Sequence, residues 1–198
     1  MITIQSNQRL FVTGMTGSGK SYWIKKFLGQ IDRFVFYDPK FEHGDINATV
    51  VFSPSELLAV LDRGVGRVVY RPMVIDDEDF NCICKVIYNQ GNLVFVIDEL
   101  FYHVTSSKIT DWHSILLRVG RKRGVGVWNC TQRPRSCLHN TILSETNHIV
   151  CFKLMLETDR RKLAESFDPL FMTANSLEPY YWIYNNSLAD AAVMMPPV

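Results

Sequence analysis

The chain has 198 residues, of which 47% are hydrophobic and 21% are charged, and its net charge is +1. This length allows one sizeable core but not two comfortable domains, and the charge excludes a global field that attracts nucleic acid or acidic membranes. The five cysteines lack CxxC spacing, which argues against a disulfide framework or structural zinc and favours a reducing cytoplasm. No apolar run approaches the ~20 residues of a membrane span, so we expect no transmembrane segment.

Short apolar runs typical of β-strands recur along the chain, separated by segments with helical patterns. The expected strands begin at Arg9 (RLFVT), Arg33 (RFVFYD), Val50 (VVF), Arg67 (RVVYR), Asn92 (NLVFVID), Gly124 (GVGVWNCT), His148 (HIVCFK) and Tyr180 (YYWIY). The expected helices cover 21–28, 54–61, 76–89, 110–121 and 157–167. Because several strands are apolar throughout, we predict a mostly parallel sheet flanked by helices on both faces. Residues from about 188 to 198 are predicted to form a flexible or partner-docking tail.

A phosphate-binding loop is predicted between the first strand and the first helix. Residues 14–21 read GMTGSGKS, which matches G-x-x-x-x-G-K-[ST] in its expected context. Glycines allow such a backbone to turn its N–H groups toward an anion, at the positive end of the next helix. We predict that Lys20 meets the β and γ phosphates and that Ser21 holds Mg²⁺. The other predicted nucleotide-binding residues are Gly14, Thr16, Gly17, Ser18, Gly19 and Tyr22.

Two acids follow the buried strand NLVFVID. Asp98 ends the strand, where its carboxylate can hold the water shell of Mg²⁺, and Glu99 follows directly. A glutamate there can polarise an attacking water as general base, which a kinase does not need. A GTPase would carry an N-K-x-D motif, and the sequence has none. Water is therefore the predicted phosphoryl acceptor.

A second polar strand end and a basic segment lie further along the chain. Thr131 and Gln132 follow the run GVGVWNC, so Gln132 is predicted to contact the γ-phosphate or orient the water. No acidic residue occurs between Asp111 and Glu145, whereas this segment holds Arg118, Arg121, Lys122, Arg123, Arg133 and Arg135. Arginines of this kind can complete a neighbouring subunit's site or contact a nucleic-acid backbone, and a solvated basic face is the alternative.

The order of these motifs resembles that of the FtsK and HerA superfamily of ring-forming, DNA-translocating ATPases. The phosphate loop, VIDE, RVGRKRGVGVWNCTQRP and SLEPYYWIYN carry the likeness, and FYDPK matches the usual D-P-K of that superfamily. The chain is most similar to the single-domain genome-packaging ATPases of tailless double-stranded DNA viruses that have an internal membrane. This resemblance implies one RecA-like P-loop domain of the ASCE class over residues 1–198, with ATP and Mg²⁺ as ligands.

The resemblance also implies roles for particular residues. Lys20 and Ser21 match the phosphate-loop pair, Asp98 and Glu99 the metal-holding and catalytic acids, and Gln132 the sensor. Arg121 matches the arginine that acts in trans on a neighbouring subunit, with Arg118 or Arg123 as alternatives.

A trans-acting arginine requires a ring, here a hexamer or pentamer, around double-stranded DNA that is bound without sequence preference. Lys108, in the loop 101–111, is the candidate pore contact with DNA. The implied partners are capsid or membrane proteins of the packaging vertex, and the implied location is the host cytoplasm or that vertex of the virion.

Three other functions remain open at this point. A conjugation, plasmid or filamentous-virus assembly ATPase would belong to the same superfamily. A small-molecule kinase would use the basic segment as a lid, and an inactive adaptor would bind nucleotide for structure only. The scattered histidines lack ligand spacing, and no chemistry is assigned to them.

Overall fold

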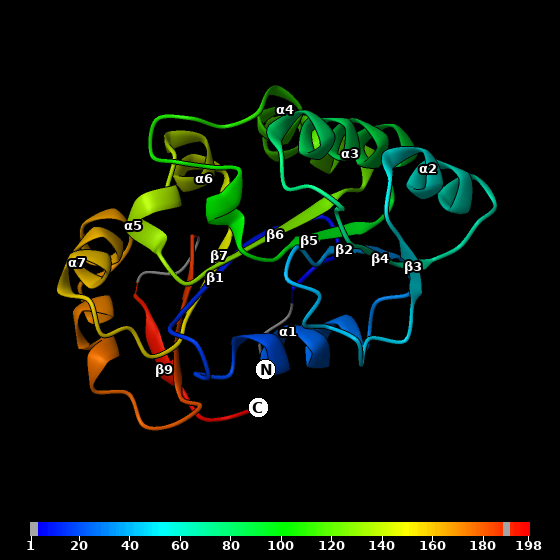
Figure 1. Cartoon of the computed structure of the whole chain (residues 1–198). Helices are drawn as coiled ribbons and strands as arrows, with labels where there is room; N and C mark the ends of the chain where they lie inside the picture. The colour runs from blue at the N-terminus through cyan, green and yellow to red at the C-terminus, as the bar shows by residue number, and fades with distance from the viewer. Residues whose placement is uncertain (1–3, 188–190) are drawn as a thin grey trace.

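The computed structural model describes residues 4–187 and 191–198, whose strands form one sheet in the order β3-β4-β2-β5-β6-β1-β7-β8-β9 (Figure 1). The strands are β1 Arg9–Thr13, β2 Phe34–Tyr37, β3 Thr49–Val51, β4 Arg67–Tyr70, β5 Val94–Ile97, β6 Gly126–Thr131, β7 His148–Cys151, β8 Trp182–Asn186 and β9 Val193–Met195. The α-helices are α1 Lys20–Leu28, α2 Pro54–Asp62, α3 Asp77–Gln90, α4 Asp111–Val119, α5 Pro134–Cys137, α6 Asn140–Glu145 and α7 Glu157–Ser166. The described residues also form the 3₁₀ helices η1 Leu100–Tyr102, η2 Gly120–Arg123 and η3 Pro169–Asn175.

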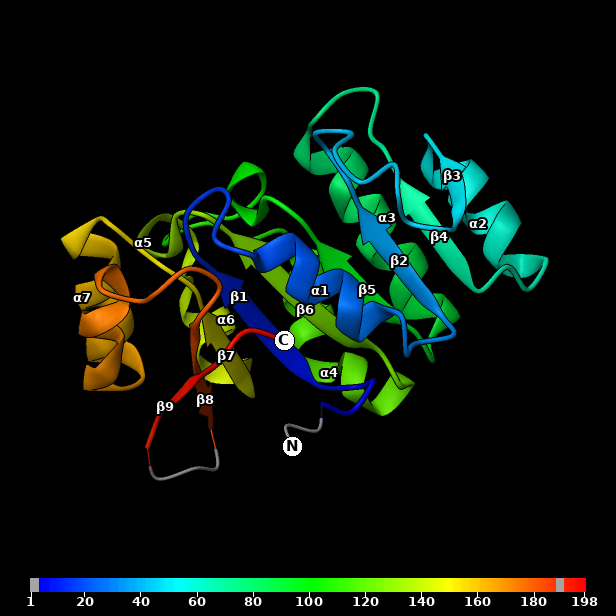
Figure 2. The same cartoon turned by 90° about the horizontal axis from the view of Figure 1, so that it is seen from below.

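Strands β1 to β7 run parallel, and β8 and β9 join them antiparallel. Strand β6 lies between β1, which precedes the phosphate loop, and β5, which precedes the two acids. The pairing aligns Thr13 with Thr131 and Ile97 with Asn129. The carboxyl ends of β1, β5 and β6 therefore meet at one edge of the sheet, where their arrowheads point in Figure 2.

Helices cover both faces of the sheet, as the sequence predicts. Helix α1 packs on one face through Trp23, Ile24 and Leu28, whereas α2, α3, α4, α6 and α7 contribute to the core on the opposite face. Figure 2 shows α1 in front of the strands, with α3 and α4 behind them. Alternate residues of β1 serve the two cores, with Leu10 on the α1 side and Phe11 on the other. The continuous apolar runs are thus explained by burial on both faces.

The helix predicted over 110–121 ends earlier than expected. Helix α4 stops at Val119, and η2 follows it. The buried side chain of Arg9 donates its Nε to Leu117 O at 2.9 Å and its Nη2 to Leu116 O at 2.8 Å. Both bonds go to carbonyls of the last turn of α4, and Leu116 O also accepts from the backbone N–H of Gly120. Arg9 lies more than a hundred residues away in sequence, whereas Gly120, the C-cap of α4, is a local signal for this helix end.

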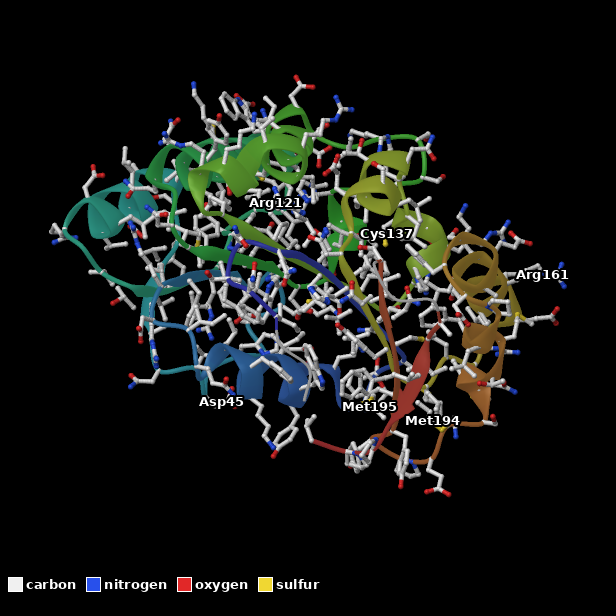
Figure 3. All side chains as sticks on the ribbon, turned by 180° about the vertical axis from the view of Figure 1, so that it is seen from behind. Asp45, Arg121, Cys137, Arg161, Met194 and Met195 are labelled. Atoms are coloured by element: carbon white, nitrogen blue, oxygen red, sulfur yellow. The ribbon has the colours of Figure 1, made fainter. Side chains whose placement is uncertain are left out.

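The carboxyl-terminal segment differs from the flexible or partner-docking tail that the sequence suggests. Val193–Met195 form β9, in which Val193 pairs with Tyr184 of β8 and Met194 with Ile183. Met194 and Met195 are labelled on this strand in Figure 3. The strand gives β8 the partner that an exposed sheet edge lacks. Residues 188–190 of the predicted tail lie outside the described residues.

Candidate nucleotide-binding and catalytic site

The loop after β1 has the backbone that an anion cradle requires. Gly14, Gly17 and Gly19 have φ values of 150°, 75° and 108°, in the region that favours glycine. A Cβ added at Gly14 would lie 2.6 Å from Phe152 Cβ, so this position also excludes any side chain. Gly19 is the N-cap of α1, whose first N–H groups are free to bind an anion. The backbone of this loop therefore has a conformation that could hold a phosphate, and its binding of nucleotide stays a prediction.

Lys20 at the start of α1 is held by its own loop. Its Nζ donates to Gly14 O at 2.7 Å and to Met15 O at 2.9 Å, and the residue is buried. Burial lowers the pKa of Lys20, although the charges of Asp98 and Glu99 act in the opposite direction. A charged phosphate is a stronger partner for an ammonium than two neutral carbonyls. The side chain is thus poised to exchange these carbonyls for phosphate oxygens.

Both predicted acids lie at the carboxyl end of β5 and are buried. Asp98 Oδ2 lies 2.9 Å from Nε2 of His43, which is also buried. Glu99 has a φ of 54°, a left-handed conformation that is uncommon outside glycine, and it is 3% exposed. Such backbone conformations cluster at functional sites. The backbone of Glu99 therefore departs from the extended conformation of β5.

Gln132 connects Glu99 to Thr16 of the loop after β1. Its Nε2 donates to Glu99 Oε1 at 2.6 Å, and its Oε1 accepts from Thr16 Oγ1 at 2.6 Å. One side chain from the end of β6 thus joins a residue after β5 to a residue after β1. A ligand that displaces Thr16 can therefore change the position of Glu99 through the Gln132 amide, as a sensor residue would.

The loop after β2 supplies residues that sequence reasoning gave no chemical role. Asp38 is fully buried and accepts from the backbone N–H groups of Glu42 at 3.0 Å and His43 at 3.3 Å, and from Arg71 Nε at 3.0 Å. The loop folded in this way places Lys40 Nζ on Glu99 Oε1 and His43 on Asp98. The D-P-K motif was the signal for Lys40. No sequence signal marks His43.

An apolar cavity of about 400 Å³ opens beside the phosphate loop. It is lined by Gly19, Tyr22, Phe152, Tyr180, Pro197 and Val198. The tyrosine rings are largely exposed, with Tyr180 at 59% and Tyr22 at 64%. An apolar cavity with aromatic walls beside the loop after β1 is suited to a nucleotide base, which stacks on aromatic rings. Tyr22 was predicted from its place in sequence, whereas Tyr180 and the carboxyl-terminal residues were not.

The structure divides the basic segment between opposite edges of the sheet. Arg133 and Arg135 follow β6, at the edge that carries the phosphate loop. Arg118, Arg121 and Arg123 precede β6 and lie at the opposite edge, where Figure 3 labels Arg121. The predicted arginine finger is therefore far from the phosphate loop of its own chain.

The three candidate arginines have different partners. Arg123 donates to two carbonyls near the end of α3, Asn89 O at 2.8 Å and Tyr88 O at 3.3 Å. Arg121 is exposed and its Nη2 donates to Asn147 Oδ1 at 2.9 Å. Arg118 makes a long contact of 3.5 Å with Thr141 Oγ1. Arg123 thus has a structural role, while Arg121 and Arg118 are held more loosely.

Lys108, the predicted DNA contact, lies in the loop between η1 and α4. Its side chain is 63% exposed, and its Nζ pairs with Asp77 at the start of α3. Asp77 also accepts from His103 at the end of η1. The lysine is therefore accessible, but part of its charge is already neutralised by this chain.

Comparison with solved structures decides the fold. The genome-packaging NTPase B204 of Sulfolobus turreted icosahedral virus 2, in complex with ATP-gammaS, superposes with a TM-score of 0.85 over 98% of this chain and 100% of B204, at 18% identity. This chain has the B204 fold. The conjugation coupling protein TcpA of pCW3 superposes with a TM-score of 0.59 at 18% identity, covering 98% of this chain and 61% of TcpA. The predicted single α/β domain with a mostly parallel sheet is confirmed.

Sequence comparison gives a match to part of a third protein. The DNA double-strand break repair helicase HerA of Saccharolobus solfataricus is 33% identical over 81 residues, which are 39% of this chain and 16% of HerA. This agrees with the FtsK and HerA resemblance of the motifs. No family model matches the chain. Within the described residues of this B204-like fold, no helix is long and apolar enough to cross a bilayer.

Proposed function

We propose that the chain is a magnesium-dependent ATPase that translocates double-stranded DNA and packages a viral genome. The observation that carries this proposal is the chain of contacts from Thr16 through Gln132 to Glu99, which joins a phosphate cradle to a catalytic acid. The B204 fold supports the viral role, because B204 is described as a genome-packaging NTPase and as a DNA-packaging ATPase. The HerA match supports DNA as the partner.

Each residue of the site has its own proposed role in ATP hydrolysis. Backbone N–H groups of the phosphate loop and Lys20 hold the β and γ phosphates. Ser21 and Asp98 offer oxygen ligands, and Mg²⁺ commonly binds through one or two protein oxygens together with substrate phosphates. Bound Mg²⁺ supplies charge neutralisation on those phosphates. Glu99 accepts a proton from the attacking water, and Gln132 orients that water or the γ-phosphate.

The base of the nucleotide is proposed to occupy the apolar cavity and stack on Tyr180. Replacement of an aromatic residue that stacks on a base costs about 1–3 kcal/mol, so Tyr180→Ala should raise the Kd for ATP about tenfold. Tyr180→Phe keeps the ring and should leave the Kd nearly unchanged. Calorimetric titration of both variants with a non-hydrolysable ATP analogue measures the difference. Equal affinities would place the base elsewhere.

The proposed working unit is a ring of six or five subunits around the DNA. The position of Arg121 supports it, because an arginine at the sheet edge opposite its own phosphate loop can serve only a neighbour's nucleotide. Capsid or membrane proteins of the packaging vertex are the proposed docking partners. Lys108 is the proposed contact with the DNA backbone, after exchange of its Asp77 partner for phosphate.

The test of the proposed function is phosphate release with and without double-stranded DNA. We expect hydrolysis that requires Mg²⁺ and is stimulated by DNA of any sequence, since phosphate contacts position a protein without reading bases. Phosphate transferred to a nucleoside would revive the kinase alternative. A monomeric protein whose rate of phosphate release is the same with and without DNA would contradict the proposed DNA-translocating function. The TcpA likeness keeps a conjugation ATPase as the second candidate, and capsid genes or transfer genes beside this one distinguish the two.

A further inference from the structure

Three consecutive apolar side chains are exposed in the loop between β4 and α3. Met73 is 76% exposed, Val74 67% and Ile75 39%. The loop projects beyond the carboxyl ends of the strands, at the top of Figure 2. Single exposed apolar residues are ordinary, whereas an exposed run of this kind is characteristic of a surface that another molecule covers. The charges around the loop indicate what docks there.

Acidic residues follow this apolar run at the start of α3. Asp76 and Glu78 are exposed, and within the described residues neither forms an ion pair. Asp77, which lies between them, is already paired with Lys108. Residues 73–78, here called the acidic corner, thus combine an apolar surface with uncompensated negative charge. A complementary partner has apolar contact area and positive charge.

The opposite edge of the sheet has a hollow where β2 and β5 begin. This cavity has a volume of about 410 Å³, and its lining includes Gln30, Ile31, Asp32, Arg33, Asn92 and Leu93. The guanidinium of Arg33 donates to two neutral oxygens, Gln90 Oε1 at 3.1 Å and Gly91 O at 3.4 Å. Asp32 offsets part of the charge of this lining, but it forms no ion pair with Arg33. The hollow therefore offers a cation to an incoming carboxylate.

The turn η2 adds positive charge beside this hollow. The backbone N–H of Asn92 donates to Arg123 O at 2.8 Å, which fixes the turn against the cavity. Lys122 of this turn is exposed and forms no ion pair within the part of the chain that the structure describes. The cavity with Arg33 and Lys122, here called the basic hollow, is thus opposite in charge to the acidic corner.

The strand order allows these two surfaces to meet in the proposed ring. An arginine finger at Arg121 sets the amino edge of one sheet against the carboxyl edge of its neighbour, because Arg121 precedes β6 and the phosphate loop follows the adjacent strand β1. Strands β2 and β4 lie beyond β5, on the side of the sheet away from β1. When two sheets meet in the same lateral order, the corner after β4 therefore lies over the hollow before β2 and β5.

We propose that the acidic corner of one subunit docks into the basic hollow of a second copy of this chain, where Asp76 and Glu78 face the neighbour's Arg33 and Lys122. This inference rests on the proposed function and names the surfaces through which its ring assembles. Each subunit carries both surfaces, so the contact is heterologous and repeats around a closed ring. Residues 73–75 supply the apolar contact area, and the charges select the partner surface and its orientation.

The test is a charge exchange that is measured as mass in solution. Glu78→Lys places like positive charges at every interface, and Lys122→Glu places like negative charges there. Like charges across an interface weaken association, so each single variant should need about tenfold or more protein to form rings. The double variant restores opposite charges and should assemble as the wild type does. Sedimentation velocity over a range of protein concentrations, with a non-hydrolysable ATP analogue and double-stranded DNA, measures assembly.

Val74→Asp tests the apolar part of the contact. The side chain is largely exposed in the single chain, so the substitution should leave the fold intact. It places a charge in the buried centre of the proposed interface, and assembly should weaken by about tenfold or more. Thermal unfolding of this and every other variant reports any loss of structure.

Glu165→Lys is the matched control. Glu165 is exposed on α7, which Figure 1 shows at the other end of the sheet from β3 and β4, so this reversal should leave assembly unchanged. If the wild type forms rings and Glu78→Lys and Val74→Asp assemble equally well, this inference alone is wrong. A double variant that assembles as poorly as the single ones would also overturn it. A wild type that stays monomeric with the ATP analogue and DNA would overturn the proposed ring and this inference together.

Discussion

Glu99→Gln is expected to lower kcat by at least about a hundredfold, since a positioned general base contributes typically 10²–10⁴-fold to a rate. The substitution keeps the size of the side chain and its place after β5, but the amide cannot accept the proton of the attacking water. Contacts from the phosphate loop and Lys20 to the nucleotide do not involve Glu99. The Kd for ATP should therefore change little. Single-turnover phosphate release and equilibrium titration with ATP measure the two quantities separately.

The matched control for this substitution is Glu157→Gln. Glu157 forms an exposed i,i+4 ion pair with Arg161 on α7, so its loss removes a similar charge outside the site. It should leave kcat unchanged, because exposed pairs contribute little. If Glu99→Gln hydrolysed ATP at the wild-type rate, another group would be the base and the role given to Glu99 would be wrong.

The parts of the fold that the sequence predicts well are those with local causes. Residues 10–12 of β1 and all residues of β5 are apolar because both faces of the sheet are covered, and the sequence alone shows this pattern. The same holds for the start of α3, where Asp76 accepts from the N–H of Asp79 at 2.8 Å as an N-cap. Short helices such as α5, four residues long, give too little periodicity to be predicted.

In the candidate site, too, the residues that the sequence predicts are those that belong to local motifs. The phosphate loop and the acids after β5 are contiguous motifs, so their chemistry can be inferred from spacing. The contact between Gln132 and Glu99 joins residues 33 positions apart, and that between His43 and Asp98 joins residues 55 apart. Sequence order predicts that strand ends meet, which brings Gln132 near Glu99, but it does not say which loop folds over them. The contact between Lys40 and Glu99 is therefore a property of tertiary structure.

Mixing two inactive variants should restore ATP hydrolysis if Arg121 acts in trans. Arg121→Ala alone is expected to lower kcat about 10³-fold or more, the range found for arginine fingers. Glu99→Gln alone is also expected to be nearly inactive. In a mixed ring, an interface formed by the phosphate-loop side of an Arg121→Ala subunit and the arginine side of a Glu99→Gln subunit holds every catalytic group. Each interface of a ring joins two different surfaces. When the two variants are mixed at random in equal amounts, about a quarter of all interfaces therefore have this complete combination.

Arg123→Ala is the control that separates this role from a structural one. Its guanidinium binds the carbonyls of Asn89 and Tyr88, so its loss should lower the free energy of unfolding and leave turnover per folded ring largely intact. Arg118→Ala, mixed with Glu99→Gln in the same way, tests the other candidate. Restored activity with Arg118→Ala but not with Arg121→Ala would transfer the role to Arg118. If neither mixture restored activity, all catalytic groups would come from one chain. The trans-acting arginine would then no longer support a ring.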